Sequence, residues 1–190
     1  PLKRCRPGQL LGMTVNAATL HQVIPLALDR GLDMLLLDCT ADVTTPWVEL
    51  AAPTDLSVLR DAIALLREMG REEEIALINF GGMRSGTDVA KALAINCHAS
   101  VFGLAAGLAM GGVVDGQGLH FPDSISPQAP ADALANWIKA TAQETAIIAR
   151  CTGKTNVHNL EPEDMRCISI ATATALGIPL ASGKVKREGF

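Results

Sequence analysis

The amino-acid sequence predicts an α/β fold in which short parallel strands alternate with helices. Four apolar runs of four to six residues lie within residues 10–102, and each precedes a stretch with apolar residues at helical spacing. The runs are mainly apolar, as expected for strands of a parallel sheet that helices cover. Four such units fit either a small open sheet or half of a β/α barrel.

The first two units lie in residues 10–38. The expected strands are 10–15 and 34–38, the second of which ends in Asp38. The helical stripe between them covers residues 20–28, and Gly31 is placed to end it. Pro25 inside this stripe is expected to kink the helix or to move its start later.

The next two units give the clearest pattern of the chain. Residues 75–79 and 99–102 are the expected strands, and residues 56–69 and 104–110 are expected helices. Thr54 or Asp55 is suited to begin the first of these helices, and Gly70 to end it. A further helix is expected between the two strands, capped by Thr87 and ended by Asn96.

The rest of the chain reads as a loop followed by a helical tail. Residues 112–130 are rich in Gly and Pro, which indicates a long loop. Helices are expected over residues 131–151 and from Pro162 to Gly177. We therefore expect residues 1–190 to form a single half-barrel domain, with its βα units in residues 1–111.

Composition bounds the class of protein. The 190 residues are enough for one buried core but too few for a complete eight-unit barrel, which needs at least about 200 residues. Hydrophobic residues are 48% and charged residues 19%, a globular composition and not a disordered one. Aromatic residues are only 3%, so the core must be aliphatic.

Charge and cysteine content exclude several partners. The net charge of −4 gives no basic surface for nucleic acid or an anionic membrane, and no apolar run reaches the roughly 18 residues that span a bilayer. No two cysteines have the spacing of a metal-ligand pair, which predicts reduced thiols in a cytoplasmic protein and no iron–sulfur or zinc motif. The five cysteines are Cys5, Cys39, Cys97, Cys151 and Cys167.

Glycines follow two neighbouring strands. Gly81 and Gly82 come directly after one expected strand, and Gly103 comes directly after the next. Backbone amides in such strand-to-helix turns can bind a phosphate, and in barrels this site follows strands 7 and 8. The alternative is that these glycines only allow tight turns.

A resemblance to a known family rests on this segment. Residues 81–94 read Gly-Gly-Met-Arg-Ser-Gly-Thr-Asp-Val-Ala-Lys-Ala-Leu-Ala, which resembles the Gly-Gly-x-Arg-Thr-Gly-x-Asp-Val-Ala-Lys-Ala-Leu-Ala segment of the flavin-binding barrel of glutamate synthase. The similarity continues to residue 111, and residues 144–180 are similar to the tail of the archaeal-type enzyme and the N-methylglutamate synthase subunit. It covers most of the chain but only the C-terminal half of the family's barrel.

The resemblance implies the C-terminal half of a TIM-type (β/α)8 barrel, with about four βα units and C-terminal helices. It also implies an FMN-dependent oxidoreductase module that acts on glutamate or a related amino acid. The residues expected to bind the FMN phosphate are Gly81, Gly82, Met83, Arg84, Gly103 and Leu104.

The chain departs from the family pattern at several places. The family's Gly-Gly-Thr-Gly stretch after strand 6 is replaced by residues 39–45, which contain no glycine, and the family's strand-5 lysine falls at or near Met13. One glycine and the threonine are missing from the phosphate turn at residues 101–104. The first cluster cysteine falls at Gly112, so no iron–sulfur cluster is expected. These losses support a second hypothesis, a cofactor-free structural or regulatory subunit of a glutamate-synthase-like complex, and the enzymatic assignment stays open.

Other chemically capable residues are expected to have structural or solvated roles, and no catalytic residue is assigned. Asp38 ends a strand where barrel catalysts project, but a loop or capping role is also open to it. Lys91 and His98 are expected on the surface, His120 in the loop, and His158 between the last helices.

Half a barrel has two open strand edges, which proteins cover. We expect the missing strands to come from another half-barrel chain, from a second copy of this chain, or from a preceding part of a longer chain. The absence of an initiating Met before Pro1 fits either Met removal or a fragment. An oligomer is therefore expected.

Overall fold

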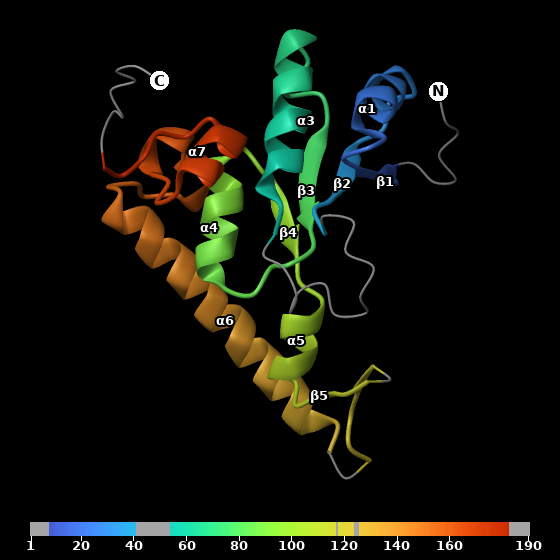
Figure 1. The fold of residues 1–190 in the computed structure, drawn as a ribbon. Coiled ribbons are helices and arrows are strands. Elements are labelled where there is room, and N and C mark those ends of the chain that lie inside the picture. The colour runs from blue at the N-terminus through green and yellow to red at the C-terminus, as the bar shows by residue number, and fades with distance from the viewer. Residues whose placement is uncertain (1–7, 41–53, 117, 124–125, 183–190) are drawn as a thin grey trace.

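Four parallel strands form the sheet of this computed structural model, which describes residues 8–40, 54–116, 118–123 and 126–182 (Figure 1). Their order in the sheet is the chain order β1-β2-β3-β4. A doubly wound open sheet reverses its strand order at a switch point, whereas a barrel does not. The order therefore favours the half-barrel. The strands are β1 (Gly12–Asn16), β2 (Met34–Asp38), β3 (Ala76–Phe80) and β4 (Ala99–Val101).

Helices follow each strand as the sequence predicts. They are α1 (Leu20–Asp29), α3 (Leu56–Glu68), α4 (Gly86–Ala94) and the short α5 (Leu104–Ala109). One face of the sheet is buried in the main core, where Leu35, Leu37 and Leu77 lie with Ile24 of α1 and Leu59 of α3. Apolar side chains at helical spacing thus cover one face of the sheet.

The opposite face of the sheet is much less covered. Thr14 on β1 is exposed, and Leu36, Ile78 and Phe80 are only half-buried, although their neighbours in β2 and β3 are fully buried. In a closed barrel this face points inward, where side chains of the remaining strands fill the interior.

The structure identifies the residues at which α3 and α4 begin. Asp55 caps α3 and its carboxylate accepts a hydrogen bond from Ser57 N at 2.9 Å, which decides between the two expected caps. The expectation that Thr87 caps α4 is wrong, because Ser85 is the N-cap and Thr87 lies inside the first turn. Pro25 lies within α1, whose start is not moved.

The Gly/Pro-rich loop contains a small hairpin. Its strands are β5 (Val113–Val114) and β6 (Leu119–His120). The helix expected from residue 131 begins earlier, as α6 (Gln128–Cys151), because Pro130 is tolerated in its first turn. This long helix runs past α5 and α4 towards the tail (Figure 1).

The second expected tail helix, from Pro162 to Gly177, is wrong over its first half. Two single turns, η1 (Val157–Asn159) and η2 (Pro162–Asp164), precede α7 (Ile170–Leu176), which Gly177 ends at φ +69°. Between η2 and α7 the chain is extended, because Cys167 pairs with Leu180 as a parallel bridge. Among the described helices, none combines the length and apolar character that a bilayer-spanning segment needs.

Candidate functional site

The turn after β3 requires glycine for packing. Gly81 and Gly82 have φ of +101° and +71°, which side chains rarely adopt. A Cβ on Gly81 would lie 2.6 Å from Thr40 Cγ2, and one on Gly82 would lie 2.6 Å from Thr54 N. The turn is therefore packed against the residues after β2 and before α3, which gives the structural alternative a physical basis.

The same turn has amides without acceptors. Gly82 and Met83 are buried, yet their N–H groups donate no hydrogen bond to any residue that the structure describes. Buried N–H groups in proteins are nearly always paired. Two consecutive ones at the carboxyl end of a strand are chemically suited to bind an anion.

The Met83 side chain anchors this turn from below. Its sulfur accepts a hydrogen bond from Asn79 Nδ2 at 2.9 Å and lies 3.5 Å from Thr54 Oγ1. The single hydroxyl hydrogen of Thr54 is donated to the Gly81 carbonyl at 2.7 Å. The position of the Gly82 and Met83 amides is thereby fixed by side chains of β3 and of the residue before Asp55.

The N-terminus of α4 is already occupied by a carboxylate. Glu144 of α6 accepts hydrogen bonds from Gly86 N at 2.8 Å, from Thr87 N at 3.1 Å and from the Thr87 hydroxyl. The Thr87 hydroxyl and the Gly86 amide lower the pKa of Glu144. Only the amides ahead of α4 therefore remain for a ligand. No sequence pattern predicted Glu144, which is 58 residues from Gly86.

Arg84 and Asp88 border the turn. The Arg84 side chain is exposed, and its backbone N donates to Asp88 Oδ2 at 3.1 Å. Asp88 also lies 3.6 Å from Lys91 Nζ, so the expected surface position of Lys91 is confirmed. Arg84 is the cation in the turn itself, as the sequence predicts.

The second expected turn lies beside the first. Gly103 is the N-cap of α5, and the buried Leu104 is its first residue. The last register pair of β3 and β4 is Phe80↔Val101, so Gly82 and Gly103 both come two residues past it. The structure thus places the two predicted turns next to each other at the carboxyl edge of the sheet.

Asp38 and Asn16 end neighbouring strands at this edge. Asp38 Oδ1 accepts from Thr40 N at 3.1 Å and from Thr40 Oγ1 at 2.6 Å, so Asp38 does shape the loop after β2. Asn16 Oδ1 accepts from Thr19 N at 3.0 Å and from Thr19 Oγ1 at 2.8 Å. Asn16 was not singled out from the sequence, because an asparagine before a helix usually reads as a turn residue.

Met13 lies on the opposite side of the sheet from the barrel interior. It pairs in register with Leu35, on the face that the helices cover, and is 39% exposed. The positions of β1 that face the interior are Gly12, Thr14 and Asn16. A lysine at position 13 would therefore point away from the interior.

The histidines are engaged elsewhere. His98 Nδ1 accepts a hydrogen bond from Leu77 N at 3.1 Å, and burial and the nearby His158 lower its pKa. His120 is exposed in the hairpin, 3.5 Å from Asp115. Within the described ranges, no three His, Cys, Asp or Glu side chains are grouped closely enough to hold a metal ion.

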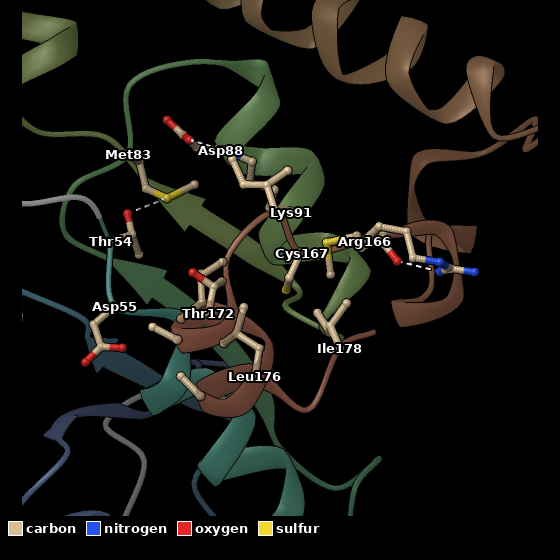
Figure 2. Close-up of a pocket in the computed structure, with 15 residues that line it drawn as sticks. Thr54, Asp55, Met83, Asp88, Lys91, Arg166, Cys167, Thr172, Leu176 and Ile178 are labelled. Carbon is tan, nitrogen blue, oxygen red and sulfur yellow. Dashed lines mark hydrogen bonds and ion pairs between the residues drawn. The ribbon is translucent and has the colours of Figure 1, made fainter. Parts of the chain in front are cut away.

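A cavity of about 770 Å³ lies behind the glycine turn. Met83 lines it from the turn, Thr54 from the segment before α3, and Cys167, Leu176 and Ile178 from the tail (Figure 2). Burial raises the pKa of the thiols of Cys39 (to about 12) and Cys97, so these two are structural groups and poor nucleophiles. The cavity joins segments more than 100 residues apart, which no local pattern predicts.

The chain is similar in sequence to a known protein. No family model matches the chain. A glutamate synthase large subunit-like protein of Rhizobium meliloti (strain 1021) is 31% identical over 200 residues, covering 88% of this chain. The resemblance to the glutamate synthase large subunit is confirmed. The chain spans 45% of that relative's length.

Solved structures support the fold. The flavin-binding domain of baker's yeast flavocytochrome b2 matches with a TM-score of 0.60 and 16% identity, over 93% of this chain and 37% of that one. A flavocytochrome b2 variant with sulfite bound gives 0.60 and 15%, over 93% and 38%. A mandelate oxidase variant gives 0.52 and 18%, over 76% and 36%. The predicted part of a TIM-type barrel is confirmed.

Proposed function

We propose that this chain is the phosphate-binding part of an FMN-dependent oxidoreductase that acts on glutamate or a related amino acid. The observation that carries the proposal is that the amides of the buried residues Gly82 and Met83 have no acceptor among the described residues. The relationship to a glutamate synthase large subunit-like protein supports both the cofactor and the substrate class. FMN, when bound, supplies hydride and electron transfer.

Each residue of the turns has a defined part in this proposal. The Gly82 and Met83 amides donate to phosphate oxygens, and the Gly103–Leu104 turn closes the site from the neighbouring strand. Arg84 adds the positive charge, since the amides of α4 are bound to Glu144. Hydrogen bonds to a charged group contribute about 1.5–3 kcal/mol each.

The proposal includes a second part of the barrel. The inward face of β2 and β3 is half-buried in the described chain, and the relative is about twice as long. Another half-barrel chain, a second copy, or another part of a longer chain would cover that face and pair with β1 and β4. We expect substrate turnover only in the completed barrel.

Flavin titration tests the proposal. The quenching of flavin fluorescence is measured for FMN and for riboflavin, which lacks the phosphate, with the complete protein. Two charge-assisted hydrogen bonds of at least about 1.5 kcal/mol each correspond to a preference of at least about 100-fold for FMN. Equal affinities would show that the amides do not bind the phosphate.

The same titration distinguishes the FMN-dependent oxidoreductase from the second hypothesis, a cofactor-free subunit. A cofactor-free subunit is favoured by one observation, the Glu144 carboxylate that already fills the anion-binding end of α4. Such a subunit would quench neither flavin and would retain no flavin absorbance after the unbound flavin is removed.

A further inference from the structure

Asn16 and Asp38 form a polar pair at the mouth of the half-barrel. They are the last residues of β1 and β2 and are Cα partners in the register. Paired strands are about 4.8 Å apart, and alternation places both side chains on the inward face with Thr14 and Leu36. The carboxyl ends of barrel strands are where barrel enzymes carry their chemistry.

Hydrogen bonds orient both side chains and leave one group of each available. Thr40 takes Oδ1 of Asp38, and no described residue donates to Oδ2. Thr19 takes Oδ1 of Asn16, so Nδ2 is the remaining donor. The result is an oriented carboxylate oxygen and an oriented amide donor on two residues that are partners in the register.

The strands supply no positive charge to the Asp38 carboxylate. None of the described residues of β1, β2, β3 and β4 is Lys or Arg. The turn for the phosphate is close, because a Cβ on Gly81 would contact Thr40. A carboxylate near a phosphate is stabilised by a positive group, and here that group must come from outside the strands.

We propose that Asp38 and Asn16 bind the amino-acid end of the substrate. Asp38 Oδ2 accepts hydrogen bonds from the α-ammonium group, and Asn16 Nδ2 donates to an oxygen of the α-carboxylate. This assignment rests on the proposed function, since it names how the same site recognises an amino acid and not a keto acid or a hydroxy acid.

The Asp38→Asn variant isolates the charge. The asparagine keeps Oδ1, which accepts from Thr40, so the turn after β2 is retained while the carboxylate is lost. Asp132→Asn is the matched control, because it removes one negative charge from the exposed side of α6. Thermal unfolding of both variants reports whether the fold is kept.

Binding of L-glutamate and of 2-oxoglutarate to the complete protein is measured by calorimetry. The two ligands differ only in the ammonium group and the keto oxygen. We expect Asp38→Asn to weaken L-glutamate binding at least 10-fold and to change 2-oxoglutarate binding less than 2-fold. Asp132→Asn should change neither.

Other outcomes overturn the inference. It is wrong if Asp38→Asn weakens both ligands equally, if it weakens neither, or if the wild-type protein binds neither. FMN binding is measured separately by fluorescence quenching. A protein that shows the Asp38-dependent discrimination but binds no FMN would refute the proposed function and leave the amino-acid site standing.

Discussion

The carboxylate of Glu144 determines which amides of the glycine segment remain for a ligand. It joins α6 to the first turn of α4 through the Gly86 and Thr87 amides. The close approach also requires Gly86, whose Cβ would lie 2.4 Å from Thr141 O. Negative charge at a helix N-terminus is favourable, so Glu144 stabilises the pairing of the two helices.

Replacing Glu144 by glutamine should destabilise the fold above about pH 5 and should have little effect in strong acid. The lowered pKa of Glu144 means that its charge stabilises the folded state above the unfolded pKa of about 4.3 and that this contribution is lost as the pH falls through the folded value. Because the side chain is partly solvated, we expect a loss of about 1 kcal/mol at pH 7.

Urea unfolding at pH 7 and at about pH 2.5, well below the ordinary glutamate pKa, measures this difference. Glu73→Gln, at an exposed position of the loop after α3, is the control and should have no effect. A Glu144→Gln defect that is equally large at both pH values would contradict the electrostatic origin.

The sequence predicts a helix or strand correctly where residues close together in the chain determine its bounds. The strand at 34–38 is predicted to the residue, because its apolar run is bounded by polar residues and glycine. The start of α4 was misplaced because the hydroxyl of Thr87 binds Glu144 of a distant helix. The extended Cys167 segment likewise depends on pairing with Leu180, which the periodicity of the tail does not contain.

A prediction about the phosphate site concerns Gly103, at the start of α5. Gly103→Val places a branched side chain where the second side of the phosphate site is proposed, so FMN binding should weaken at least 10-fold. Gly116→Val is the matched control, because a Cβ there meets nothing within 4 Å. Fluorescence titration measures both, and unchanged affinity in Gly103→Val would move the phosphate away from α5.

At the scale of the molecule, helices cover one face of the sheet, whereas the described residues cover the opposite face only in part. The core on the helix side gives the described chain its order, whereas Thr14, Leu36, Ile78 and Phe80 face the interior of a barrel that is only partly present. The sequence predicts this half-barrel because each βα unit has its own apolar run followed by apolar residues at helical spacing. What completes the half-barrel depends on residues outside these four units.

This chain alone should not turn over substrate. The described strands offer no Lys or Arg towards the interior, and Met13 points to the helix side. A missing cation beside a reduced cofactor costs on the order of 1–3 kcal/mol in a partly buried site. We therefore expect no glutamate formation from 2-oxoglutarate, ammonia and a chemical reductant, even with FMN added. Activity that appears when the other half of the barrel is supplied would place the cation there, whereas turnover by the chain alone would refute the prediction.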